Sequence, residues 1–180
     1  METKLARKLS NLDDALSIFS NALNLELTSF QELVADNIKS GQIQKFEFTI
    51  ELLWKTIQAF LYEVDGVDVA TPKSVAKEFV KAGYCDYPMY ELFIQAINDR
   101  NQLSHIYRQE MAESIWSRLP EYENLAKNFA TIMREKYFGK ELKSSTSLHS
   151  TADSPASLNL SSVPSPLARQ VLNVCRQPSG

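Results

Sequence analysis

The sequence has few cysteines, with only Cys85 and Cys175 among its 180 residues. They form no Cys-x-x-Cys unit, so the sequence supports neither a cysteine-ligated zinc site nor a disulfide framework. It also lacks a His-Glu-x-x-His pattern, a glycine-rich phosphate loop and a nucleophile elbow. We therefore predict no metal, no cofactor and a reducing compartment.

Glycine, excess positive charge and long apolar runs are also scarce. Five glycines are too few for a turn-rich all-β chain. A net charge of -3 argues against a broad cationic face for duplex DNA. No apolar run approaches the roughly 20 residues that cross a bilayer, and Asp13 and Asp14 interrupt any signal-peptide core. We expect a soluble, cytoplasmic protein that binds neither membranes nor duplex DNA.

The composition changes near Lys143. Residues 143–180 hold ten serines and four prolines but no aromatic residue. Such a segment buries too little apolar surface to offset the entropy of ordering it. We predict one folded domain over residues 1–142 and a disordered tail over 143–180. A short helix at 166–176 that docks on a partner is the alternative for part of this tail.

Apolar residues spaced three and four apart predict an all-α domain. The first stripe predicts a helix over residues 2–23, and a second helical region is expected over 29–64 with a kink or break at Gly41. The later part of this region is apolar on more than one face, which is typical of a helix at the centre of a bundle.

Capping residues define the remaining helices. Thr71 and Pro72 begin a short helix that Gly83 ends. Two more helices are expected over about 86–103 and 109–137, the last broken or bent at Pro120. The predicted fold is an up-and-down bundle of about five helices.

One polar, titratable cluster adjoins an apolar helix, in the segment Asp-Arg-Asn-Gln-Leu-Ser-His-Ile-Tyr-Arg at 99–108. It contains Arg100, Asn101, His105 and Tyr107, whereas the second histidine, His149, lies in the predicted tail. Histidine exchanges protons near neutral pH, and arginine offers a charged fork for phosphate oxygens. These groups suit metal-independent RNA cleavage through the ribose 2'-hydroxyl. The alternative is a helix C-terminus at which cations simply meet the dipole.

The directions of Arg100 and His105 on a helix affect whether one protomer could use both. On a regular helix Arg100 and His105 lie about 140° apart, so one protomer need not aim both at one phosphate. A homodimer would bring two copies of the segment together in one composite cleft.

The segment Arg100-Asn101-Gln102-Leu103-Ser104-His105-Ile106-Tyr107 resembles the signature of HEPN domains. Upstream, Phe-Glu-Phe-Thr-Ile-Glu-Leu-Leu-Trp-Lys at 46–55 is similar to the central helix of one HEPN branch, the nucleotidyltransferase substrate-binding proteins. The stretches at 71–87 and 116–129 resemble its short helix and its last helix. The resemblance covers roughly residues 4–138 and excludes the tail.

This resemblance implies a dimeric helical bundle that partners a minimal nucleotidyltransferase. In the toxin-antitoxin version the HEPN protein is a ribonuclease, and the nucleotidyltransferase neutralises it and can transfer AMP to the motif tyrosine. By position, Arg100 would orient the scissile phosphate, His105 would be the acid or base, Asn101 would support the site, and Tyr107 would be modified. The alternative implied by the resemblance is a non-catalytic subunit that binds a nucleotide or substrate for its partner.

Two further sets of residues have two interpretations each. Glu47, Glu51 and Lys55 follow i, i+4 spacing, which favours a solvated row of ion pairs; the resemblance leaves open that the carboxylates line the cleft. Trp54 and Trp116 lie on apolar faces, where we expect core residues rather than base-stacking platforms.

Overall fold

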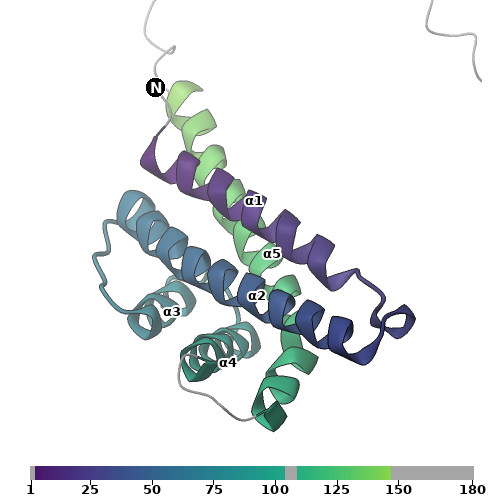
Figure 1. The fold of residues 1–180 in the computed structure, drawn as a ribbon. Helices are drawn as coiled ribbons and strands as arrows, with labels where there is room; N and C mark the ends of the chain where they lie inside the picture. Colours follow the sequence, from purple (N-terminus) through teal and green to yellow (C-terminus); the bar gives the residue numbers. More distant parts are fainter. Residues whose placement is uncertain (1–2, 104–108, 147–180) are drawn as a thin grey trace, which may run out of the picture.

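The computed structural model describes residues 3–103 and 109–146 of the chain (Figure 1). Within these ranges it contains no strand and five α-helices, so the predicted all-α class is confirmed. The helices are α1 (Lys4–Leu23), α2 (Glu32–Phe60), α3 (Pro72–Lys81), α4 (Tyr87–Leu103) and α5 (Gln109–Thr146). A 3-10 turn at Leu27–Ser29 precedes α2, and a π-helical turn at Leu61–Asp65 follows it.

Local capping explains where several helices begin and end. The Thr3 hydroxyl accepts a hydrogen bond from the amide of Ala6 at 3.1 Å, and Thr71 does the same at the start of α3. Gly83 follows α3 with φ of 77°, and the amide of Tyr84 donates to the carbonyl of Phe79. This left-handed glycine cap is the stop that the sequence predicts.

Helix α2 is the centre of the bundle, because it contacts each of the other four helices. α1 runs antiparallel to it, α5 lies behind both, and α3 and α4 form a short pair against its later half (Figure 1). Its buried face contributes Phe46, Ile50, Leu53, Ile57 and Phe60 to a core shared by all five helices. The prediction of a central helix is therefore confirmed.

The sequence predicts a kink or break at Gly41, and the break is absent. α2 is helical from Glu32 to Phe60, and nothing lies within 4 Å of the position that a Gly41 side chain would occupy. One glycine costs a helix only about 1 kcal/mol relative to alanine. Next to it the buried Gln42 donates to the carbonyl of Ala22 at 2.7 Å and accepts from the Trp116 indole at 2.6 Å. These contacts hold this turn between α1 and α5.

The sequence predicts a break or bend at Pro120, and the break is likewise absent, since α5 is one helix from Gln109 to Thr146. Proline removes one backbone hydrogen bond, but burial on both sides of Pro120 outweighs that loss. Ile115 and Leu119 precede it, Tyr122 and Leu125 follow it, and all four are buried in the common core. None of the helices in the described part of the chain is both long and apolar enough to span a membrane.

Candidate functional site

Arg100 lies near the end of α4, and its guanidinium reaches across to α2. Its Nη2 lies 3.1 Å from Oε2 of Glu51, and its Nη1 donates to Oδ1 of Asn101 at 3.2 Å. The Nε atom is buried and has no hydrogen-bond partner among the described residues. One donor of the arginine fork is thus left for another acceptor.

Glu51 is the residue around which this cluster is built. Oε1 lies 2.7 Å from Nζ of Lys55, while Oε2 accepts from the Trp54 indole at 3.0 Å and pairs with Arg100. Burial alone would raise the pKa of Glu51, but the hydrogen bonds from Lys55 and Trp54 and the charge of Arg100 outweigh it and lower the pKa. The carboxylate therefore stays charged and holds two cations side by side.

Glu47 lies one helical turn before Glu51 on the same face of α2. It is half-buried, and burial raises the pKa of its carboxyl, with the charge of Arg100 opposing the shift. The pKa values of the two carboxyls beside Arg100 thus move in opposite directions. The raised pKa of Glu47 favours its protonated form, and the lowered pKa of Glu51 favours its charged form. We call Arg100, Asn101, Glu47, Glu51 and Lys55 the Arg100 cluster.

The end of α4 is fixed from the other side by Asp99. Its side chain is only 8% exposed, and Oδ2 accepts from the hydroxyl of Tyr122 at 2.5 Å and from Nη2 of Arg118 at 2.7 Å. Burial and the bond to Asp99 raise the pKa of Tyr122, so its hydroxyl keeps its proton and donates. Asp99 therefore anchors α4 to α5, while its neighbour Arg100 faces α2.

The structure describes only part of the predicted site. Arg100 and Asn101 are in contact, whereas His105 and Tyr107 lie outside the described residues. The ion pair expected between Glu51 and Lys55 is present, and Arg100 joins it, so a carboxylate of α2 lies beside the predicted cluster, as the alternative interpretation expected. The i, i+4 spacing of the charges on α2 was the available signal, but nothing in that spacing says that α4 packs against the same face.

The two tryptophans are half-buried at the edge of the core rather than fully inside it. Trp54 places its indole N–H on Glu51, so it supports the Arg100 cluster. Trp116 donates to Gln42, and its ring lies 4.8 Å from the ammonium of Lys39. Each ring therefore has a polar partner as well as apolar contacts.

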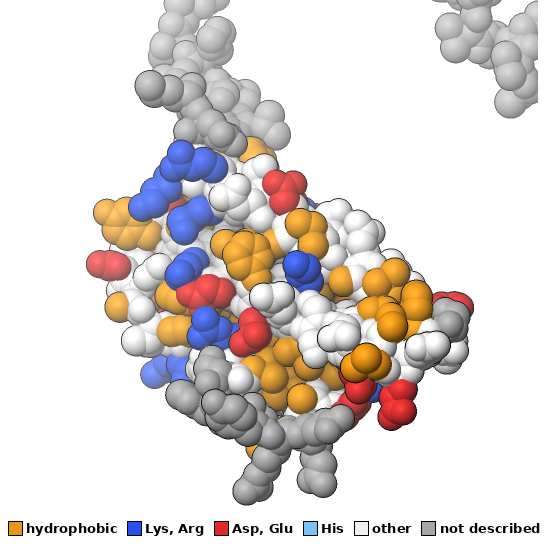
Figure 2. All heavy atoms as spheres, viewed as in Figure 1, with side chains coloured by type: hydrophobic (Ala, Val, Ile, Leu, Met, Phe, Trp, Pro, Cys, Tyr) orange, Lys and Arg blue, Asp and Glu red, His pale blue; other side chains and the backbone are white. Residues whose placement is uncertain are grey.

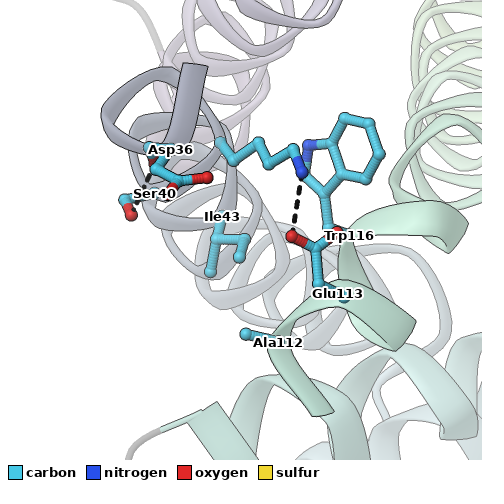
Figure 3. A pocket seen from close by; sticks show the side chains of 7 residues that line it. Asp36, Ser40, Ile43, Ala112, Glu113 and Trp116 are labelled. Atoms are coloured by element: carbon cyan, nitrogen blue, oxygen red, sulfur yellow. Dashed lines mark hydrogen bonds and ion pairs between the residues drawn. The ribbon is translucent and has the colours of Figure 1, made fainter. Parts of the chain in front are cut away.

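A hollow of about 210 Å³ lies between α2 and the start of α5 (Figure 3). Lys39 on α2 and Glu113 on α5 both line it, with Nζ of Lys39 2.8 Å from Oε1 of Glu113. The hydrogen bond to Glu113 raises the pKa of Lys39, so this pair is held together across the hollow. The cations of both sites are paired with an acid of the chain, but this hollow has one cation in its lining whereas the Arg100 cluster has two, so it is the weaker candidate for an anionic ligand.

The family comparison covers most of this bundle. Residues 7–135 match the model of the family described as "Nucleotidyltransferase substrate binding protein like". The match spans well over half of the chain and includes both α2 and α4. The chain belongs to this family.

One solved structure supports the same architecture. It is a crystal structure of a protein from Thermus thermophilus, 28% identical to this chain, with a TM-score of 0.61. The match covers 68% of this chain and 98% of the Thermus protein. Our search of curated proteins found no match.

Proposed function

We propose that this chain is the substrate-binding subunit of a nucleotidyltransferase pair and that the Arg100 cluster contacts a phosphate group of the substrate. The observation that carries the proposal is the arrangement of Arg100 and Lys55 on the two oxygens of Glu51, at 3.1 and 2.7 Å. The family match over residues 7–135 supports the partner, a minimal nucleotidyltransferase.

The chemistry of the cluster fits a phosphate. A guanidinium offers a planar fork of donors to phosphate oxygens, and an ammonium adds a second positive charge. Glu51 keeps both cations in place while the site is empty, and an incoming phosphate would compete with it for Arg100 and Lys55.

Asp99 makes this arrangement rigid. The bonds from Tyr122 and Arg118 hold the last turns of α4, so Arg100 is oriented before any ligand arrives. Groups that need no reordering bind their ligand at a lower entropic cost.

A reconstituted transfer assay tests this function. Purified nucleotidyltransferase from the same source would receive ATP labelled at the α-phosphate and a cell extract of RNA and small molecules as acceptors. We expect the chain to raise the initial rate of label transfer at least tenfold, whereas an unrelated helical protein of equal size should not. Equal rates with and without the chain would contradict the proposal.

A second function, RNA cleavage by a homodimer, is favoured by one observation. Glu47 is a half-buried carboxyl with a raised pKa close to Arg100, and such groups serve as proton donors or acceptors. With His105 as acid or base, Arg100 on the scissile phosphate and Asn101 in support, the chain would be a metal-independent ribonuclease toxin. The nucleotidyltransferase would neutralise it by attaching AMP to Tyr107.

Two substitutions separate the functions. In the ribonuclease, H105A should lower RNA cleavage by a factor of about 10² to 10⁴, because proton transfer typically contributes that much. Y107F should escape AMP attachment, seen as no mass increase with ATP and the partner. If the wild-type dimer leaves RNA intact in the absence of the partner, the ribonuclease function is wrong and the binding function is retained.

A further inference from the structure

A second hollow, of about 320 Å³, adjoins the one between α2 and the start of α5. Leu23, Leu25 and Leu27 line it from the end of α1 and the chain after it, and Trp116 and Pro120 line it from α5. Trp116 also lines the first hollow, so the two meet at its ring. We call the residues that line the two hollows the Trp116 groove.

Large apolar side chains are exposed beside this groove. Phe30 and Leu33, around the start of α2, are 46% and 75% exposed, and Met111 at the start of α5 is 40% exposed. Met111 precedes Ala112, which lines the groove. Figure 2 shows hydrophobic side chains gathered over the start of α2, with acidic side chains beside them. An apolar surface with a polar rim is typical of a binding surface.

The charged residues at the groove are mostly acidic. Asp36, Lys39 and Glu113 line it, and Lys39 is paired with Glu113. Asp36 forms no salt bridge with any residue that the structure describes, and the same is true of Glu32 on α2 and Glu121 on α5. The groove is therefore complementary to an apolar segment that also carries positive charge.

Residues 166–176 of this chain, Pro-Leu-Ala-Arg-Gln-Val-Leu-Asn-Val-Cys-Arg, have this chemistry. This tail segment lies outside the described residues, and it contains two arginines and no acid. On a regular helix its apolar side chains from Leu167 to Cys175 would fall within an arc of about 160°, with Arg169 and Arg176 beside one edge. Amphipathic helices of this kind bind with the apolar face in a hydrophobic groove.

Local signals favour a helix over the tail segment. Ser165 and Pro166 repeat the pair that begins α3, where Thr71 caps the helix and Pro72 is its first residue. Pro178 follows the segment, and proline is common just after the end of a helix.

The chain is long enough for the tail segment to reach the groove. From Trp116 to Thr146 the axis of α5 is about 45 Å long at 1.5 Å per residue. The linker over residues 147–165 can span up to about 60 Å when extended. The segment can therefore reach the groove of its own chain.

We propose that the tail segment binds as a helix in the Trp116 groove of the same chain. Its apolar face lies on Trp116 and the leucines of the second hollow, and Arg169 and Arg176 lie toward the carboxylates that have no salt bridge. Burial of apolar surface on both sides drives the contact. The groove of a second copy is the alternative place for the segment, and another protein is the alternative occupant of the groove.

Amide relaxation measured by NMR on the full chain tests this contact. We expect order parameters of about 0.85 for the tail segment, the value of rigid backbone. V171D places a charge in the apolar face and should lower these values below about 0.6, as in a flexible chain. S161D places the same charge in the tail but outside the segment, and it should leave the values unchanged.

A matched pair of substitutions tests the groove. L25D changes a side chain that lines the groove, whereas I18D changes one on α1 that does not. The two side chains are 49% and 53% exposed, so both variants should keep the fold, which circular dichroism would verify. We expect L25D to lower the order parameters of the tail segment as V171D does, and I18D to leave them unchanged.

The outcomes separate the proposed contact from its alternatives. Order parameters that stay constant on tenfold dilution support a contact within one chain, and values that fall show a contact between copies and overturn it. Values below about 0.6 in the wild-type chain, or equal losses in L25D and I18D, would also overturn the proposal. These measurements involve neither the Arg100 cluster nor a nucleotidyltransferase, so their outcome is independent of the proposed function.

Discussion

Asp99 and Arg100 are neighbours in the chain, but their side chains contact different helices. Asp99 is buried against Tyr122 and Arg118 of α5, whereas Arg100 pairs with Glu51 of α2. The sequence predicts that this segment is polar and ends a helix. It does not show which charge is buried, since that depends on how α4 sits between α2 and α5.

Loss of Asp99 should destabilise the bundle. In D99A the hydroxyl of Tyr122 and the guanidinium of Arg118 lose their shared acceptor, and breaking a buried pair typically costs about 3 kcal/mol or more. Urea unfolding would measure this change. D14A removes an exposed carboxylate on α1 and should change the free energy of unfolding by less than about 0.5 kcal/mol. Equal changes in the free energy of unfolding for D99A and D14A would show that the buried contacts of Asp99 do not stabilise the fold.

Replacing Glu47 should stabilise the protein, in contrast to D99A, and by an amount that depends on pH. Burial places its folded-state pKa above the unfolded value, so the stability that this group contributes is present at low pH and is lost as the pH rises through the raised pKa. E47Q removes this loss. Its melting temperature should exceed that of wild type at pH 7, and the difference should shrink at pH 4.

The control for Glu47 is E91Q, which neutralises an exposed carboxylate on α4 and should show little change at either pH. A melting temperature of E47Q below wild type at pH 7 would mean that attraction to Arg100 outweighs the cost of burial.

At the scale of elements, capping and apolar spacing predict where the helices lie, but they do not predict that a helix runs unbroken through a glycine or a proline. The start of α3 at Pro72 and its glycine stop were both predicted from residues that act locally. The unbroken courses of α2 through Gly41 and of α5 through Pro120 were not, because packing against other helices overrides a local weakness. The same holds for the Arg100 cluster, which needs two helices to meet.

Two glycines give a matched test of this distinction. G41A fills open space inside a helix and should stabilise the protein by about 0.5–1 kcal/mol. G83A forces a side chain into a left-handed turn, with φ of 77°, and should destabilise it by about 1 kcal/mol. Thermal unfolding should show a higher melting temperature than wild type for G41A and a lower one for G83A. Destabilisation by G41A would indicate that this turn of α2 needs glycine for another reason.

At the scale of the molecule, charge is distributed unevenly. The full chain carries a net charge of -3, yet Lys4, Arg7, Lys8, Lys55 and Arg100 lie along α1, α2 and α4. An acidic protein can thus present a local cationic surface to a phosphate-bearing ligand, which composition alone does not reveal. The separation of a folded domain at 1–142 from a tail at 143–180 stays a prediction, as does dimerisation.

The central claim is that Arg100 contacts the substrate rather than only joining α4 to α2. The most direct measurement is the transfer assay with R100Q over a range of acceptor concentrations. R134Q is the matched control, since Arg134 also pairs with a single carboxylate, Asp13, but between α5 and α1. The account predicts that R100Q raises the half-saturating acceptor concentration at least tenfold while the maximal rate is retained, with R134Q close to wild type. An unchanged half-saturating concentration in R100Q would contradict it.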